Sequence, residues 1–463
     1  MKIKLTNLGP LKYAEFEPGD LTLICGQNNT GKTYATYALY GFLALWEEYI
    51  PLVIPDAAID QILQAGVLYL PLQDYQDQAQ ALLEQGCKAY TQNLSKIFAA
   101  QADRFSQTRF QVIASPAEVQ PLKKYQRQIG SETTAFFSIT KETQSDDLVV
   151  TLLVNQQKQT IPREILKEII SKSLRFNLFR NLLPRPFIIS AERTGSAIFR
   201  QELNFSRNRL LEKMAQSSKD INPMELLFQE YEDYALPIQA NVEFTRKLEI
   251  IAKKTSFIAQ KHPGILEEFG EIIGGSYTVT GDDELYYSPK GKKSVKLSMD
   301  ESSSAVRSLL DLGFYLRHEA QPKDWLLMDE PELNLHPANQ QRLARLLARL
   351  VNLGMKVLIT THSDYIVREF NTLIMLNQPD DEYLQGIAQE EGYDSGELLE
   401  ASRVRVYIAE AASVMLPGKK RKTKGLTLTP AEVSPTEGID ARSFDPTIEE
   451  MNRIQGRIFW REV

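Results

Sequence analysis

The sequence predicts an α/β fold, a parallel sheet with an antiparallel β subdomain and helical insertion lobes, and two stretches carry that prediction. Near the N-terminus, the apolar run 21–25 fits a strand buried on both faces, and a glycine-rich loop joins it to proline-free helix formers from 32 to about 48. In the last third, strands and helices alternate between 326 and 376. Such alternation implies parallel strands joined by right-handed crossovers.

Composition and periodicity predict the other elements in order. Predicted strands lie at 3–5, 13–16, 110–112, 135–140, 148–154, 186–190, 326–328, 356–360 and 373–376, with short strands between 277 and 297. Predicted helical segments are 51–104, which is rich in Ala, Leu and Gln, then 162–183, 195–270 and 363–370. A further helix presents one apolar face, because its leucines and valine recur at helical spacing: Leu343, Leu346, Leu347, Leu350 and Val351.

These elements suggest a discontinuous core with additions. We expect the core to comprise residues 1–50, 105–195 and 271–400. Outside it we expect a helical insertion at 51–104, a helical lobe at 196–270, and a C-terminal segment at 401–463 that carries a basic loop at 419–424. A run of like charges in such a loop is usually solvated, and it can also contact nucleic acid or an acidic partner.

Composition excludes several classes of protein. The 463 residues are 43% hydrophobic and 24% charged, and 53 basic against 60 acidic side chains give a net charge of −7. That balance argues against a surface devoted to nucleic acid. No apolar run approaches the length of a membrane span, the opening residues lack a signal-peptide pattern, and two cysteines cannot form a disulfide framework. We expect a cytoplasmic protein.

The loop after the first buried strand has the pattern of a phosphate-binding loop, Gly26-Gln-Asn-Asn-Thr-Gly-Lys-Thr33. Two glycines let the backbone N–H groups point at phosphates, and the following helix aims its positive end at the anion. Lys32 is expected to reach the β- and γ-phosphates of ATP, and the Thr33 hydroxyl to bind Mg²⁺. The alternative is a chance glycine-rich turn. The candidate nucleotide-binding residues here are Gly26, Asn28, Asn29, Thr30, Gly31, Lys32 and Thr33.

An acidic pair, Asp329-Glu330, ends the apolar strand 326–328. At the carboxyl end of a buried strand, Asp329 can hold the magnesium shell and Glu330 can act as general base on the attacking water. Alone, such a pair often marks a surface turn. His362 ends the next strand, where it can hydrogen-bond the γ-phosphate or the attacking water. A structural histidine is the alternative.

The order of these motifs resembles ABC-type ATPases, particularly the SMC-like and OLD-like bacterial ATPases. The resemblance rests on the phosphate loop, the Asn-Leu-His-Pro that follows the acidic pair, and the Thr-His-Ser around His362. It implies a signature segment that binds the γ-phosphate held by a second protomer, and the matching residues are Ser302, Ser303 and Ser304. An ordinary serine helix cap is the alternative.

A second segment, Ser190-Ala-Glu-Arg-Thr-Gly195, resembles the Ala-Glu-Arg segment of OLD-like ATPases. By that resemblance Glu192 and Arg193 lie near the nucleotide, and a structural salt bridge is an equal alternative. The chain length and the tail that begins at Ser443 most resemble the ATPase subunits of PARIS anti-phage defence systems.

The resemblance implies an ATPase that uses ATP and Mg²⁺ and assembles with itself, at least as a dimer with shared sites. It implies two further partners, a separate nuclease or toxin effector and a phage-encoded trigger protein. The sequence carries no nuclease-type acidic cluster beyond the nucleotide motifs, so cutting would fall to the effector. The competing interpretation is an SMC-like ATPase of DNA repair or chromosome maintenance, which would favour a long coiled coil. A transporter subunit fits less well, because the signature segment departs from the transporter form.

Overall fold

The computed structural model describes residues 1–130, 135–153, 162–198, 234–281, 284–292, 295–416, 418–419, 421–440 and 445–460. Much of the expected helical lobe, residues 199–233, lies outside the described residues, as do Lys420 of the basic loop and Ser443 of the tail. The chain folds into two compact units. The first comprises Met1–Leu5, Phe42–Asn93 and Thr108–Arg185, and the second comprises Thr6–Gly41, Leu94–Gln107 and Pro186–Val463.

The first unit contains an antiparallel sheet with the strand order β4-β8-β7-β6. Its strands alternate as half-buried strands do, so that Leu68 and Leu70 of β4 are buried while Tyr69 between them is exposed. Its elements are α2 (Asp56–Ala65), β4 (Val67–Pro71), α3 (Leu72–Gln76), α4 (Ala79–Gln92), β5 (Arg109–Ile113), β6 (Tyr125–Gly130), β7 (Ala135–Lys141), β8 (Asp147–Leu152) and α6 (Arg163–Phe179).

Two findings in this unit differ from the sequence prediction. The segment 51–104, expected to be helical, contains β4, whose short alternation was hidden among helix formers. The strands of 108–185, expected to belong to the core, group with 42–93 in the first unit, because β8 pairs with β4. The predicted strands at 110–112 and 135–140 are confirmed as β5 and β7.

The second unit is larger. Strand β1 (Lys2–Leu8) begins in the first unit and ends in the second, and helix α1 (Lys32–Tyr49) begins in the second unit and ends in the first. Its strands are β2 (Leu11–Phe16), β3 (Leu21–Cys25), β9 (Pro186–Ile189), β10 (Gly275–Val279), β11 (Leu285–Pro289), β12 (Leu297–Ser298), β13 (Trp325–Asp329), β14 (Lys356–Thr361), β15 (Val404–Val414), β16 (Thr423–Ala431), β17 (Val433–Ser434) and β18 (Gly438–Ile439). Its helices are α5 (Leu94–Phe98), α7 (Arg193–Ile198), α10 (Leu236–Arg246), α11 (Leu248–Ile251), α12 (Phe257–Lys261), α13 (Pro263–Ile273), α14 (Ser304–Ser308), α15 (Leu310–Phe314), the π-helical turn η3 (Tyr315–Glu319), α16 (Pro337–Asn352), α17 (Asp364–Met375), α18 (Glu382–Glu390) and α19 (Asp445–Trp460).

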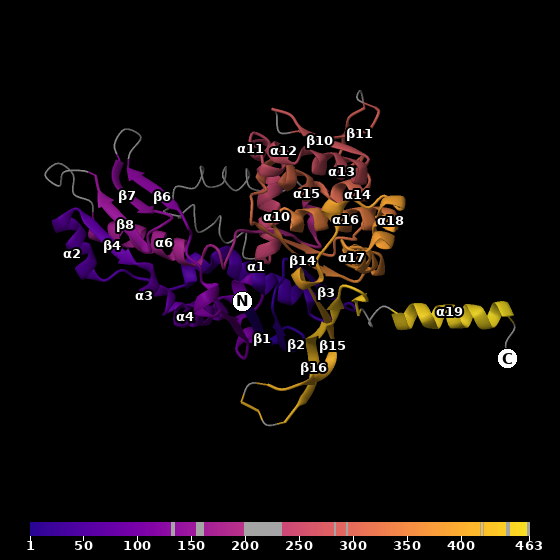
Figure 1. Cartoon of the computed structure of the whole chain (residues 1–463), viewed down its shortest axis with the longest axis horizontal. Coiled ribbons are helices and arrows are strands. Elements are labelled where there is room, and N and C mark those ends of the chain that lie inside the picture. The colour runs from indigo at the N-terminus through magenta and orange to yellow at the C-terminus, as the bar shows by residue number, and fades with distance from the viewer. Residues whose placement is uncertain are drawn as a thin grey trace, which may run out of the picture. The chain divides into compact units, whose positions relative to one another are not determined.

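The main sheet of this unit has the order β1-β2-β16-β15-β3-β14-β13-β9. The strands β15, β3, β14, β13 and β9 are mutually parallel, and β16 returns antiparallel to β15. A separate antiparallel sheet is formed by β10, β11 and β12. Figure 1 shows α13 to α16 lying together beyond β14 and β3 in this view. The predicted fold class, a parallel sheet with antiparallel and helical additions, is confirmed.

Helix α16 presents the predicted apolar face, since its leucines at 343, 346, 347 and 350 are buried and it packs against α13 and α17. The predicted strand 373–376 is wrong: residues 364–375 form the single helix α17. Its buried residues Ile366, Phe370, Leu373 and Ile374 recur at helical spacing, so the final apolar run completes a helix face. Among the described residues, no helix is long and apolar enough to cross a membrane.

The C-terminal segment is part of the main sheet, although the sequence prediction put it outside the core. β15 lies between β3 and β16, with Val404 opposite Leu21 and Ile408 opposite Cys25. Figure 1 shows β15 and β16 side by side, continuing together beyond the rest of the sheet. Strand pairing over such sequence distances is a tertiary property that local composition does not encode.

Removing residues 401–463 is expected to prevent folding of the second unit, because β3 and β2 lose the strands that separate them and expose unpaired edges. We expect an insoluble product, or one without a cooperative thermal transition by circular dichroism. Removing only 441–463 is the matched control, since Met451, Ile454 and Ile458 of α19 are exposed. A chain of residues 1–400 that melts like the full protein would contradict the prediction.

Candidate nucleotide-binding site

Three segments with predicted functional residues leave the main sheet at one edge. In the parallel register Asp329 of β13 is opposite Thr360 of β14, and Thr361 is opposite Cys25 of β3. The carboxyl ends of parallel strands lie at the same edge of a sheet, where α/β proteins bind ligands. The phosphate-loop residues, the acidic pair and His362 therefore start from adjacent strand ends.

The loop between β3 and α1 has a backbone that requires its two glycines. Gly26 and Gly31 have φ of 139° and 96°, conformations that side chains disfavour. A Cβ on Gly26 would lie 2.6 Å from the carbonyl oxygen of Ala409 in β15, and one on Gly31 would lie 2.6 Å from Leu11 Cγ. Inside the loop, Lys32 Nζ donates to the carbonyls of Gly26 and Gln27 at 2.9 and 2.8 Å. Burial lowers the Lys32 pKa.

The loop lines a cleft of about 590 Å³, a size typical of small-molecule sites. Its lining consists of Pro10, Asn28, Asn29, Thr30, Gly31, Lys32, Thr33, Tyr34 and Glu330. The cleft therefore joins the predicted phosphate-binding residues to the predicted general base. Of the described residues that line it, none belongs to the serine segment 302–304.

Asp329 is buried beside the loop and has one carboxylate oxygen in use. Its Oδ1 accepts hydrogen bonds from Thr360 Oγ1 and, at 3.4 Å, from Thr33 Oγ1. Its Oδ2 is buried and has no hydrogen-bond partner among the described residues. Desolvation by burial raises the pKa of this carboxyl to about 6. A buried carboxylate with an unpartnered oxygen, next to the hydroxyl of the residue that ends the glycine-rich loop, suits a hard cation such as Mg²⁺.

Glu330 has a backbone in the left-handed region, with φ of 50°, and hydrogen bonds fix it on both sides. Its N–H donates to the Thr360 carbonyl at 3.0 Å, and its carbonyl accepts from Arg193 Nη2 at 2.8 Å. A residue other than glycine persists in this region only where its surroundings hold it. The strained turn brings the Glu330 side chain to the cleft, where it is a quarter exposed.

Arg193 is fully buried, and all its hydrogen bonds in the described structure go to backbone carbonyls rather than to an acidic side chain. Its Nη1 donates to Ser190 and Asp329 at 2.9 and 2.8 Å, and its Nε donates to Ser308 at 2.7 Å. The salt bridge that the sequence left open is therefore not formed by this residue. Glu192, its neighbour, accepts a hydrogen bond from the Tyr37 hydroxyl of α1 at 3.0 Å.

His362 lies between two carboxylates. Its Nδ1 is 3.2 Å from Glu332 Oε1 and 3.6 Å from Glu330 Oε1. The same Glu332 oxygen accepts from the His362 backbone N–H and from Thr361 Oγ1, both at 2.8 Å. The sequence analysis did not single out Glu332. Its only signal there was a charged residue in the turn directly after the acidic pair.

The serine segment divides into an inner and an outer part. Ser302 is buried, and its hydroxyl donates to the Ser298 carbonyl at 2.7 Å. Ser303 caps the short helix α14 by accepting from the Val306 N–H, and Ser303 and Ser304 are exposed. The apolar side chains that follow the serines, Val306, Leu309 and Leu310, are buried.

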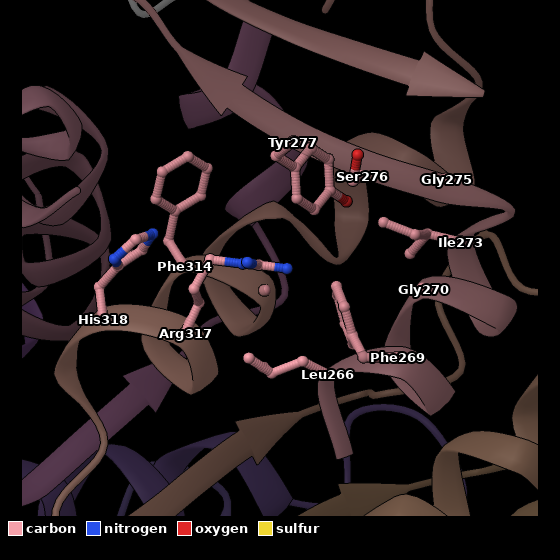
Figure 2. Close-up of a pocket in the computed structure, with 11 residues that line it drawn as sticks. Leu266, Phe269, Gly270, Ile273, Gly275, Ser276, Tyr277, Phe314, Arg317 and His318 are labelled. Atoms are coloured by element: carbon pink, nitrogen blue, oxygen red, sulfur yellow. The ribbon is translucent and has the colours of Figure 1, made fainter. Parts of the chain in front are cut away.

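A second cavity, lined by residues of α13, β10, α15 and η3, has a volume of only about 30 Å³. Figure 2 shows Phe269, Tyr277, Phe314 and the Arg317 side chain around this space. The Tyr277 hydroxyl donates to the carbonyl of Val306 in α14. This cavity is too small for a ligand, and its aromatic walls support the helix that carries the exposed serines.

Comparison with known proteins defines the family. Residues 1–367 match the AAA_15 family, an AAA ATPase domain, and the chain therefore belongs to that family. No curated protein sequence matches the chain significantly. Two solved structures are similar at low TM-score. The SMC head bound to the C-winged helix domain of ScpA has a TM-score of 0.31 and 11% identity over 91% of this chain and 97% of that chain. The SMC head domain from Thermotoga maritima has a TM-score of 0.29 and 10% identity over 93% and 98%.

Asp329→Asn is expected to stabilise the nucleotide-free protein above pH 6. The folded-state pKa of about 6 exceeds the ordinary 3.8, so the ionised carboxyl destabilises the fold once the pH passes the folded pKa. Urea unfolding without Mg²⁺ should show a gain of roughly 2 to 3 kcal/mol at pH 7.5 that shrinks toward pH 4. The exposed control Asp380→Asn should give no change. A gain that is equal at both pH values would contradict the assignment.

Proposed function

We propose that this chain binds ATP with Mg²⁺ in the loop cleft and hydrolyses it. One observation carries the proposal: Thr33 Oγ1 of the loop lies 3.4 Å from Asp329 Oδ1, while Glu330 lines the same cleft as Lys32. A phosphate loop, a buried carboxylate for a cation and a second carboxylate at the cleft are the parts that phosphoryl transfer to water requires. Membership of an ATPase family supports the same reaction.

Each residue has a role that follows from its position. Lys32, which now donates to two loop carbonyls, would exchange them for phosphate oxygens. Thr33 and Asp329 would hold Mg²⁺, which supplies positive charge to the phosphates when bound. Glu330 would accept a proton from the attacking water, since its side chain reaches the cleft from a fixed backbone. His362 would orient that water or a phosphate oxygen.

We further propose that the active form is a dimer with shared sites. Ser303 and Ser304 are exposed and do not line the cleft of their own chain, as far as the described residues show. In ABC-type ATPases, which the motif order resembles, the signature segment meets ATP bound by a second protomer. A second copy would thus close the open side of the cleft, and hydrolysis would loosen the contact.

Mixing two inactive variants, Lys32→Ala and Ser303→Glu, is expected to restore part of the ATPase activity. Each heterodimer would contain one site with an intact loop from one chain and an intact serine segment from the other. Phosphate release measured across a titration of one variant into the other checks this.

The matched control mixes Lys32→Ala with Glu330→Gln. Both residues belong to the same half of a site, so no intact site can form and no recovery is expected. If heterodimers form and the first mixture is as inactive as the control, Ser303 does not act across an interface.

The biological role we propose is phage defence, in which ATP holds a separate nuclease or toxin effector until a viral protein triggers its release. This proposal rests on the resemblance of the motifs and tail to ATPase subunits of PARIS systems. The basic loop, of which Lys419, Arg421, Lys422 and Lys424 are described and exposed, offers a surface for an acidic partner.

Co-expression with the neighbouring genes tests this role. The Glu330→Gln variant, which keeps ATP but lacks the base, is expected to retain an effector through purification in ATP, whereas Lys32→Ala should lose it. Mass spectrometry of the bound fraction identifies the partner. Recovery of a chromosome-associated complex instead would favour the SMC-like alternative and overturn the defence role.

A further inference from the structure

The carboxylate of Glu332 is built into the end of the sheet. Its side chain is only 6% exposed, and its Oε1 accepts from Thr361 Oγ1 and from the His362 N–H, both at 2.8 Å. Burial and, secondarily, the Glu332 charge raise the pKa of the Cys25 thiol at the end of β3 to about 12. An acidic side chain is rarely buried without a specific use.

The second oxygen makes the burial harder to explain by packing alone. Glu332 Oε2 is buried and has no hydrogen-bond partner among the described residues. An unsatisfied buried acceptor destabilises a fold, so its presence needs a reason beyond stability. The carboxylate as a whole faces the neighbouring imidazole, whose Nδ1 lies 3.2 Å from Oε1.

The two nitrogens of His362 have different surroundings. Nδ1 faces the Glu332 oxygen at 3.2 Å and a Glu330 oxygen at 3.6 Å, and an ionised carboxylate only accepts hydrogen bonds. A lone pair on Nδ1 would face negative charge, whereas an N–H there would place a partial positive charge beside both carboxylates. The Glu330 oxygen is too far for a good hydrogen bond, which leaves that carboxylate free for water.

We propose that Glu332 is a positioning residue that holds His362 as the Nδ1–H tautomer, so that Nε2 is the nitrogen that meets the nucleotide and its attacking water. This inference rests on the proposed ATPase function for its consequence. A neutral His362 would then accept a hydrogen bond from the water at Nε2. It could donate to a γ-phosphate oxygen only after Nε2 takes up a proton.

The tautomer is measurable without nucleotide. The chain has four histidines, so ring signals of isotope-labelled histidine can be assigned by NMR, with His362→Asn identifying the relevant one. We expect the Nδ1–H form in the wild-type protein and in Glu332→Gln, whose amide oxygen still accepts. In Glu332→Ala we expect a shift toward the Nε2–H form. A wild-type His362 in the Nε2–H form, or one unmoved by Glu332→Ala, overturns the proposal even if ATP is hydrolysed.

ATPase kinetics provide the second readout. Glu332→Ala is expected to lower kcat roughly 10- to 100-fold with KM nearly unchanged, as loss of a residue that orients a functional histidine does. Glu332→Gln should recover most of that loss. Glu369→Gln, a buried acidic position on α17, is the matched control and should behave like wild type. If the wild-type protein hydrolyses no ATP, the proposed function fails while the tautomer result still decides the role of Glu332.

Discussion

The buried guanidinium of Arg193 is the constraint on which the geometry of the second unit depends. A charge withdrawn from water must have its donors satisfied, and here they bind the carbonyls of Ser190, Ser308, Asp329 and Glu330. The guanidinium thereby links the end of β9, the helix α14 and the end of β13. A displacement of α14 would reach the backbone of Glu330 through a single side chain.

The buried acidic groups near this arginine reduce the stability of the free protein. Burial raises the pKa of Asp329 to about 6 and that of Asp311 to about 7. Among the described residues, one oxygen of each, and one of Glu332, is buried without a hydrogen-bond partner. Groups of this kind concentrate at functional sites, where a bound cation or a substrate supplies the missing interaction. The free protein is therefore less stable than its core would allow.

Sequence patterns predicted those parts of the site that are encoded by contiguous residues. The phosphate loop, the acidic pair and His362 follow strands whose apolar runs are easily recognised, and the structure brings them to one edge. The sequence pointed to Arg193 but could not predict its hydrogen-bond partners, because these are backbone carbonyls, which leave no pattern in the sequence. Glu332 was missed because its role depends on a contact across two strands.

The fold was predictable to a similar extent. Helix α16 followed from its spacing, but the run 373–376 has an apolar composition that fits a strand as well as the end of α17. The pairing of β15 with β3 could not be predicted. All five residues of β3 are buried, so its sequence does not indicate which strand lies on which side, and the choice of neighbour depends on the whole sheet.

That pairing sets the order in which the protein can mature during synthesis. β3 emerges early from the ribosome, yet both of its neighbours, β14 and β15, belong to the last third of the chain. Gly26, at the start of the loop, rests against the Ala409 carbonyl of β15. Until translation is nearly complete, β3 has neither of its partner strands, and the loop that begins at Gly26 lacks the strand against which it packs. The nascent chain thus depends on late-arriving residues, and premature termination yields a chain whose glycine-rich loop has no completed sheet beside it.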